Sequence, residues 1–247
     1  MWSDRTTRRA ALALAAGLSL VAALPALAQD GAKKIRIGVI GAGNIGGTIG
    51  TLWVKDGHEV MFASRHSEAL ATMVSELGPK AKAGTPDEAI AFGDAMFIAV
   101  PYKAYPDLAK EIGPSLKGKI VLDAGNATQK RDGALYDEVQ ASGIGAISAK
   151  YFPGAKLVRA FNAANYKVFA KEGAEGGKAR AGGRMAIPIA GDDPEALKVA
   201  EGLVRDAGFD PVVVGPLKDA DKFAMGSPGF GHDVTAPELR EKLGLAK

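Results

Sequence analysis

Residues 34–65 read KIRIGVIGAGNIGGTIGTLWVKDGHEVMFASR, and this stretch contains the pattern that decides the fold. The apolar run over residues 35–40 predicts a buried strand, and the glycine-rich hexapeptide of residues 41–46 follows at once. Apolar side chains then recur at helical spacing as far as Trp53, and residues 59–63 form a second apolar run. A strand, G-x-G-x-x-G, a helix and another strand, in this order, are the context that a dinucleotide-binding turn requires.

Each glycine of the motif has a physical role in such a turn. Gly41 allows the tight turn out of the strand, Gly43 lets a pyrophosphate approach the backbone, and Gly46 lets the helix pack closely on the sheet. Free amides at the start of the helix face the phosphates, where the helix dipole is positive. We therefore predict a pyrophosphate site made by Gly41, Ala42, Gly43, Asn44, Ile45 and Gly46. The alternative is a glycine-rich turn that serves the fold alone.

The end of the second strand indicates which dinucleotide binds. NAD sites usually carry Asp or Glu there, whereas NADP needs cationic or hydroxyl donors for its 2′-phosphate. This chain has Ser64 and Arg65 at that point, and the next acid is Glu68. The Arg65 guanidinium can hold a phosphate with two hydrogen bonds, and Ser64 can donate another. We expect NADP(H) rather than NAD(H); the alternative is a solvated Arg65 at a strand end.

The rest of the chain alternates predicted strands and helices, which indicates an α/β fold of Rossmann type, with a doubly wound, mostly parallel sheet. The further predicted strands are 80–83, 95–100, 119–123, 157–161, 185–190 and 211–214, and the predicted helices are 67–77, 85–92, 104–112, 193–206 and 235–244. We expect an NADP-binding Rossmann domain over residues 29–165 and a small C-terminal α/β extension over 166–247 that completes the cleft. Residues 170–183, rich in Gly, Lys and Glu, are predicted to form a flexible flap.

Right-handed crossovers would bring three loops to the carboxyl edge of the sheet, beside the glycine turn: Val100–Tyr102, Gly125–Ala127 and Phe161–Ala163. Loop amides at this edge can bond ribose or carboxamide groups, which makes Asn126 and Asn162 candidates. The Tyr102 side chain can shield a nicotinamide ring, or pack on the next helix instead. No metal site is expected, because the three histidines are scattered along the sequence.

The first 28 residues are predicted to be an export signal. Arg8-Arg9 precede an Ala- and Leu-rich run, and Ala26-Leu27-Ala28 supplies a cleavage site, so the segment resembles a twin-arginine signal for the periplasm. The alternative is an uncleaved membrane anchor. Removing these residues leaves 28 basic and 27 acidic side chains. The net charge of the remaining chain therefore does not indicate binding to nucleic acid. The absence of cysteine excludes disulfides and thiolate nucleophiles.

With these motifs placed, the chain resembles the NADP oxidoreductase family that includes the coenzyme F420-dependent NADP reductases. The resemblance rests on IGVIGAGNIGGTIG (37–50), FASR (62–65) and LVRAFN (157–162). It implies a cleft in which NADP(H) exchanges hydride with a deazaflavin; related domains of membrane ferric reductases pass hydride to a flavin. It also implies that Val100 and Pro101 line the nicotinamide ribose, and that Asn126, Phe161 and Asn162 lie on the acceptor side. Residues 66–69 lack a basic residue common in the family, which predicts a weaker preference for NADP.

The leading functional hypothesis is an exported NADP(H)-dependent oxidoreductase with a flavin- or deazaflavin-type acceptor. Hydride transfer needs alignment more than acid–base groups, and the sequence shows no convincing acid–base set. One alternative is reduction of a small carbonyl or imine, which needs a proton donor that the sequence does not identify; replacing Tyr102 with Phe would test that residue for the role. The other is a non-catalytic NADP-binding protein. The predicted partner is a small redox acceptor, and the chain is a candidate for a homodimer.

Overall fold

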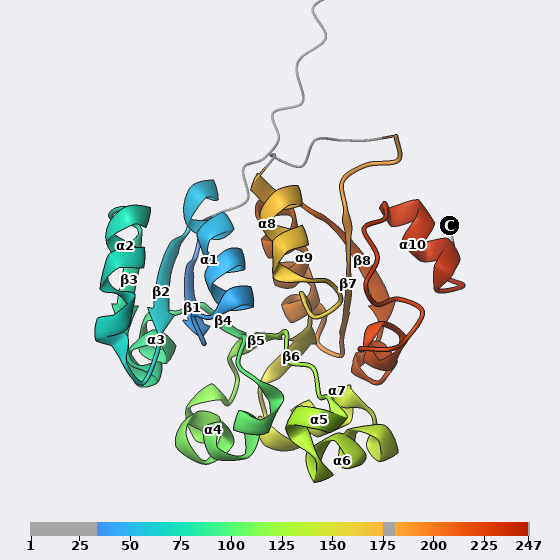
Figure 1. The fold of residues 1–247 in the computed structure, drawn as a ribbon, viewed down its shortest axis with the longest axis horizontal. Coiled ribbons are helices and arrows are strands. Elements are labelled where there is room, and N and C mark those ends of the chain that lie inside the picture. Colours follow the sequence, from blue (N-terminus) through green and yellow to red (C-terminus); the bar gives the residue numbers. More distant parts are fainter. Residues whose placement is uncertain (1–33, 175–180, 247) are drawn as a thin grey trace, which may run out of the picture. The chain divides into compact units, whose positions relative to one another are not determined.

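In the part of the chain that this computed structural model describes, residues 34–174 and 181–246, eight strands form one sheet in the order β3-β2-β1-β4-β5-β6-β7-β8 (Figure 1). The strands are β1 (Arg36–Ile40), β2 (Glu59–Ala63), β3 (Ala81–Gly84), β4 (Ala95–Ile98), β5 (Ile120–Asp123), β6 (Lys156–Arg159), β7 (Ala186–Gly191) and β8 (Asp210–Gly215). Strands β1 to β6 are parallel; β7 is antiparallel to β6 and parallel to β8. The predicted Rossmann-type, mostly parallel sheet is confirmed.

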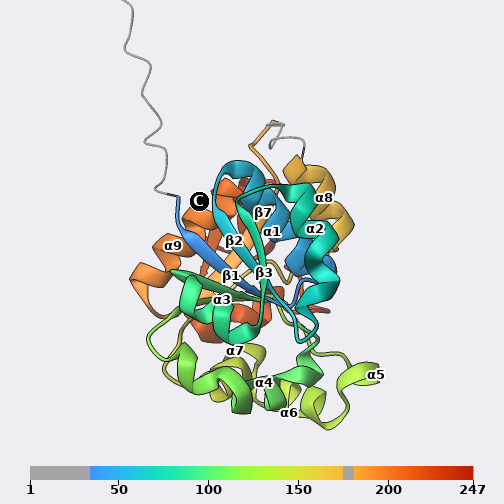
Figure 2. The same cartoon turned by 90° about the vertical axis from the view of Figure 1, so that its left-hand side faces the viewer.

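Helices cover both faces of this sheet (Figures 1 and 2). They are α1 (Asn44–Asp56), α2 (Ala71–Leu77), α3 (Pro86–Phe92), α4 (Tyr105–Ile112), α5 (Gln129–Asp132), α6 (Ala134–Ser142), α7 (Ile144–Tyr151), α8 (Tyr166–Ala174), α9 (Pro194–Asp206) and α10 (Ala236–Lys242). The 3-10 helices are η1 (Ser67–Leu70), η2 (Tyr102–Ala104), η3 (Gly113–Leu116) and η4 (Leu217–Phe223). Helix α1 contacts α2, α8 and α9, whereas α7 contacts α4, α6 and η4. None of the helices described is long and apolar enough to cross a membrane.

The alternating side chains of the central strands divide the interior into two cores. In β1, Val39 belongs to the core that includes α1 and α9, and the next residue, Ile40, belongs to the core that includes α4 and α7. Phe97 and Ile98 in β4 divide in the same way. Both cores are built from fully buried strand residues, as expected where helices cover both faces of a parallel sheet.

The helices were harder to predict from the sequence than the strands. Helices α5 to α7 occupy residues 129–151, where no element was predicted. The flap predicted over residues 170–183 is wrong for its first part, because α8 continues to Ala174. Residues 175–180 lie outside the described part of the chain, and so does the predicted export signal. The predicted domain boundary at residue 165 falls just before α8, and β7 and β8 continue the same sheet beyond it.

Candidate functional site

The glycine turn joins β1 to α1 in the geometry that an anion site needs. Gly41 has φ +97°, and a side chain there would collide with Val100 and the Ala99 carbonyl. Gly46 approaches the Gly41 carbonyl so closely that a Cβ would lie 2.0 Å from its oxygen. A Cβ on Gly43, in contrast, would meet nothing within 4 Å. Gly43 caps α1 without any side-chain hydrogen bond, so the first amides of this 13-residue helix remain available to a phosphate.

A first cavity of about 700 Å³ opens on one side of this turn. It contains seven of the residues predicted to bind the cofactor: Gly41, Ala42, Gly43, Ser64, Arg65, Val100 and Pro101. Arg65 is exposed at the end of β2, and the Ser64 hydroxyl oxygen accepts a hydrogen bond from the His66 amide at 3.0 Å. Lys103, which sequence reasoning missed, lines the same cavity. The lining thus combines the uncapped start of α1 with two cationic side chains, Arg65 and Lys103, and two acidic ones, Asp107 and Glu111.

A second cavity of about 580 Å³ opens on the other side of the start of α1. Asn126, Phe161 and Asn162, which were predicted on the acceptor side, line it. Asn44 and Ile45, which were predicted to contact the pyrophosphate, line it as well. A loop that the sequence did not suggest, residues 224–235 after η4, closes it and contributes Met225, Phe230, Gly231, His232 and Asp233. We call this segment the C-terminal loop. Its glycine spacing was visible in the sequence, but nothing in the sequence placed it beside α1.

The two predicted amide side chains bond directly to each other. Asn126 Nδ2 donates to the backbone carbonyl of Asn162 at 2.7 Å, and Asn162 Nδ2 lies 3.4 Å from Asn126 Oδ1. Asn162 Nδ2 also donates to the carbonyl of Phe223, at the end of η4, at 3.1 Å. These bonds fix the loops after β5 and β6 to each other and to the end of η4. Asn162 is nearly fully buried, so its role is to position the wall, whereas Asn126 is partly exposed.

The side chains of two predicted aromatic residues, Tyr102 and Phe161, are buried in the core. Tyr102 is fully buried, stacks on Tyr105 with ring centroids 4.2 Å apart, and lies 3.1 Å from the Ser148 hydroxyl in α7. Burial and the charge of Asp123 raise its pKa, so the phenol keeps its proton, and it lines neither cavity described here. Of the two alternatives for Tyr102, the structure shows packing on the helices of that face and not shielding of a nicotinamide.

Phe161 lies at the second cavity, but its ring belongs to the core. The ring packs edge-to-face with Trp53, Phe97 and Phe169 at centroid distances of 5.8–5.9 Å. Its φ is +58°, the one positive value among the non-glycine residues described. Such a conformation is unfavourable for a bulky residue. The turn at Phe161 places the ring in the hydrophobic core and leaves the following residue, Asn162, in the wall of the second cavity.

A buried ion pair lies beneath the loops after β5 and β6. Arg159 Nη1 is 2.5 Å from Asp123 Oδ2, and both side chains are fully buried. Asp123 Oδ1 accepts from the Gly125 amide at 2.8 Å and from the Tyr105 hydroxyl, and Arg159 Nη2 donates to the Gly125 carbonyl. The role of Asp123 is therefore structural. It is paired and out of reach of any acceptor.

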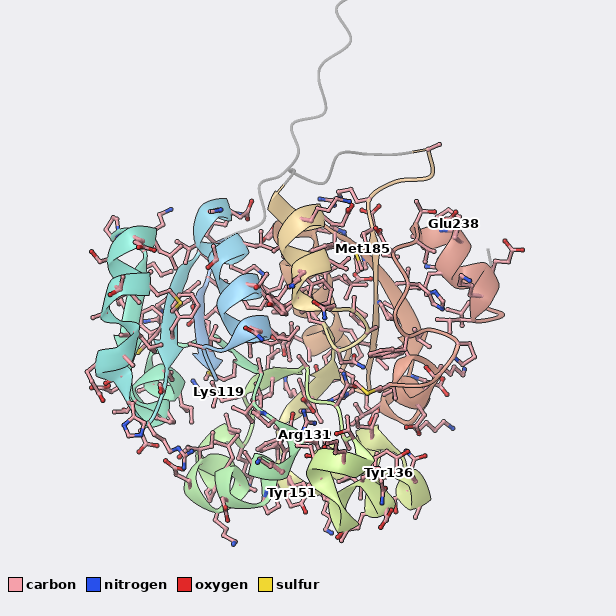
Figure 3. All side chains as sticks on the ribbon, viewed as in Figure 1. Lys119, Arg131, Tyr136, Tyr151, Met185 and Glu238 are labelled. Atoms are coloured by element: carbon pink, nitrogen blue, oxygen red, sulfur yellow. The ribbon has the colours of Figure 1, made fainter. Side chains whose placement is uncertain are left out.

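Asp132, at the end of α5, connects the walls of the two cavities. Its carboxylate accepts from the backbone amides of Lys103, at 2.9 Å, and Thr128, at 2.6 Å. Arg131, labelled in Figure 3, donates to the same carboxylate through Nε and Nη2 at 2.9–3.1 Å, and also to the carbonyl of Asn126. Lys103 lines the first cavity and Asn126 the second. Neither Arg131 nor Asp132 stood out in the sequence, because they lie outside any motif.

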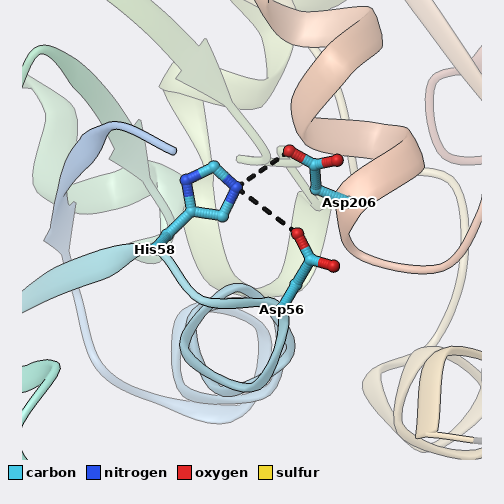
Figure 4. A group of neighbouring side chains, drawn as sticks. All are labelled: Asp56, His58 and Asp206. Atoms are coloured by element: carbon cyan, nitrogen blue, oxygen red, sulfur yellow. Dashed lines mark hydrogen bonds and ion pairs between the residues drawn. The ribbon is translucent and has the colours of Figure 1, made fainter. Parts of the chain in front are cut away.

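One further group of side chains could ligate a metal ion. His58 Nε2 lies 2.9 Å from Asp206 Oδ2 and 3.7 Å from Asp56 Oδ2 (Figure 4). The Lys34 ammonium pairs with both carboxylates, and the Ile35 amide lies 3.2 Å from His58 Nδ1. Because Lys34 already supplies the positive charge, we interpret the group as a structural ion-pair network. It joins the chain at the amino ends of β1 and β2 to the end of α9, at the edge opposite the cavities.

Replacing Asp132 with Asn tests whether its charge holds the two loops. Burial acts to raise the pKa of Asp132, but the hydrogen bonds from Arg131 and the Thr128 and Lys103 amides outweigh it and hold the pKa below its usual range. Its stabilising contribution is therefore present above the unfolded pKa of about 4 and is lost as the pH falls through the lower folded value. We expect Asp132→Asn to lower the free energy of unfolding by about 1–3 kcal/mol at pH 7, and by progressively less below pH ~4.

Urea denaturation at several pH values measures this difference. Asp137→Asn, an exposed aspartate of α6, is the matched control and should change stability little at any pH. An equal loss of stability at pH 7 and pH 3 would contradict the role assigned to the Asp132 carboxylate.

Comparison with known proteins agrees with this geometry. Residues 36–127 match the family described as NADP oxidoreductase, coenzyme F420-dependent. Metalloreductase STEAP3 of Rattus norvegicus is 28% identical over 194 residues, which are 78% of this chain and 36% of the rat protein. This chain therefore spans little more than a third of the length of that curated relative.

Two solved structures have a similar fold. The hypothetical protein SMa0349 of Sinorhizobium meliloti is 25% identical, with a TM-score of 0.66 over 81% of this chain and 95% of that one. A candidate F420-dependent NADP reductase of Arthrobacter sp. FB24 is 24% identical, with a TM-score of 0.62 over 76% and 87% of the two chains. At this identity the second likeness concerns the fold alone. The resemblance predicted from the sequence is thus confirmed: residues 36–127 match the model of the NADP oxidoreductase family described as coenzyme F420-dependent.

Proposed function

We propose that this protein transfers hydride between NADP(H) and a flavin- or deazaflavin-type acceptor. The observation that carries the proposal is the position of the two cavities, which lie on either side of the start of α1. Gly41 to Gly43 line the first cavity, and Asn44 and Ile45 line the second. A dinucleotide whose pyrophosphate binds the free amides of α1 would extend its adenosine half into the first cavity and its nicotinamide into the second.

The residues at the end of β2 support NADP(H) as the cofactor. No acidic residue follows β2 before Glu68, and Arg65 and Ser64 present a guanidinium and a hydroxyl at the cavity wall. A guanidinium can bind the 2′-phosphate of NADP with two charge-assisted hydrogen bonds. Lys103 adds a second cation to the same cavity, which Asp107 and Glu111 also line.

The second cavity suits a flat ring system. Its wall combines amide side chains, Asn44 and Asn126 among them, with apolar residues such as Ile45, Met225 and Phe230. Amides and apolar surface hold and orient a ring without supplying a nucleophile, and most of the barrier reduction in hydride transfer can come from such alignment. The name of the relative STEAP3, a metalloreductase, also supports a redox function.

Reduction of a small carbonyl or imine is the second candidate function. It needs a proton donor beside the nicotinamide, and the Tyr102 phenol does not line the second cavity. His232 does line it, and its imidazole is the group that favours this second candidate.

A binding titration followed by addition of acceptors tests the proposed function. We expect NADPH to bind the purified protein, measured by its fluorescence, and to be oxidised, measured at its absorbance maximum, when riboflavin or 5-deazariboflavin is added. Oxidation by a simple aldehyde or imine, but by neither ring compound, would favour the second candidate. Binding without oxidation by any acceptor would indicate a non-catalytic NADP-binding protein.

Replacing Arg65 with Ala tests the choice of cofactor. Loss of a charge-assisted pair with the 2′-phosphate should weaken NADPH binding by about 1.5–3 kcal/mol, or roughly 10- to 100-fold in Kd, and leave NADH binding nearly unchanged. Titration with each nucleotide measures this. Arg240→Ala, in α10, is the control and should alter neither Kd. Equal weakening of NADPH and NADH binding would exclude a specific contact between Arg65 and the 2′-phosphate.

We also propose that the chain is exported to the periplasm by the twin-arginine route. The support is the sequence of residues 1–28, with Arg8-Arg9 before an apolar run and Ala26-Leu27-Ala28 at its end. In cells that produce the full chain, we expect a shortened protein in the periplasmic fraction. Replacing Arg8 and Arg9 together with Lys should leave the full-length form in the cytoplasm. Export that is unaffected by this replacement would contradict the proposed route.

A further inference from the structure

His232 lies in the wall of the cavity proposed for the acceptor. It belongs to the C-terminal loop, is partly exposed, and lines the second cavity together with Asn126 and with Asn44 at the start of α1. The loop after β5, the start of α1 and the C-terminal loop therefore enclose one volume. A ring held there would have the imidazole in reach of its edge.

The backbone on both sides of His232 is fixed. The Gly231 amide donates to the carbonyl of Ala163 at 2.6 Å, which ties the loop to the segment after β6. On the other side, the Ala186 amide of β7 donates to the carbonyl of Val234 at 2.7 Å. Thr235 continues this pairing through a bridge with Met185. Because the chain is anchored directly before and shortly after it, His232 is held at the cavity wall.

His232 is the side chain of this cavity best suited to donate a proton near neutral pH. Of the described residues that line it, three carry titratable groups: Tyr166 at the start of α8, His232, and its neighbour Asp233. An ionised carboxylate has no proton to donate, and a phenol is a weak acid at neutral pH. Imidazole is the group most often used as a general acid in enzymes. The other polar lining side chains are amides, which do not ionise.

We propose that His232 is a catalytic general acid for the reaction of this site. This inference rests on the proposed function. As NADPH is oxidised, its hydride carries two electrons to the acceptor, and the acceptor heteroatom that gains negative charge takes a proton from the His232 imidazolium. The products are NADP⁺, the acceptor reduced by one hydride and one proton, and neutral imidazole, which regains its proton from water. For a flavin or deazaflavin the heteroatom is a ring nitrogen.

The test compares the protein with its His232→Gln and His232→Ala variants, with riboflavin and 5-deazariboflavin as acceptors at saturating NADPH. Gln keeps hydrogen-bonding capacity but cannot ionise. We expect His232→Gln to lower kcat about 100-fold and to leave the Kd for NADPH within about twofold. The kcat of the unsubstituted protein should fall as the pH rises, and the kcat of the variant should not depend on pH. Added imidazole should partly restore kcat in His232→Ala.

His66→Gln is the matched control, because His66 is highly exposed and lines neither cavity described here. It should retain the kcat and the pH profile. If His232→Gln keeps both as well, the role assigned to His232 is wrong while the proposed function stands. If the unsubstituted protein binds NADPH but oxidises it with neither acceptor, the proposed function fails, and this inference fails with it.

Discussion

The ion pair between Asp123 and Arg159 is the interaction on which the functional edge of the sheet depends. Two opposite charges are fully buried at the adjacent carboxyl ends of β5 and β6, and each also bonds the backbone of Gly125. Charges in such an environment are tolerated only when they are paired and hydrogen-bonded, and breaking one such pair typically costs about 3–5 kcal/mol. The pair therefore fixes where both strands end. The ion pair therefore also determines where the following loops, which carry Asn126 and Asn162, begin.

The start of α1 imposes the second constraint on the site. A helix that begins without a side-chain cap leaves amides unsatisfied, which is unfavourable unless water or an anion binds there. Gly43 leaves the approach open, while Gly41 and Gly46 bring the strand and helix so close that no side chain fits between them. The missing cap thus costs local stability, and it leaves an anion site between the two cavities. This arrangement suits a ligand with a phosphate bridge in its middle.

The sequence predicted the elements that repeat a regular pattern and missed the contacts that join distant segments. The apolar runs gave the strands to within a few residues, and the glycine motif located the turn, because both depend on neighbours in the chain. The direction of the Tyr102 and Phe161 side chains depends on which helix covers each face, which no local pattern contains. Asp132 and the C-terminal loop lie at the site only because tertiary packing brings distant segments together, and no local sequence pattern shows this. The pairing of His58 with Asp206 joins residues 148 positions apart. Helices α5 to α7 are short and lack strong apolar periodicity, so they escaped prediction.

The left-handed backbone at Phe161 couples the wall of the second cavity to the packing of the core. An unfavourable φ of this kind costs of the order of 1 kcal/mol or more and persists only when the surroundings enforce it. Here the enforcing contacts are the rings of Trp53, Phe97, Phe169 and Phe209 around Phe161. The shape of the second cavity is thus set partly by residues that do not line it. Substitutions in this aromatic cluster would therefore reshape the second cavity while the lining residues themselves stay as they are.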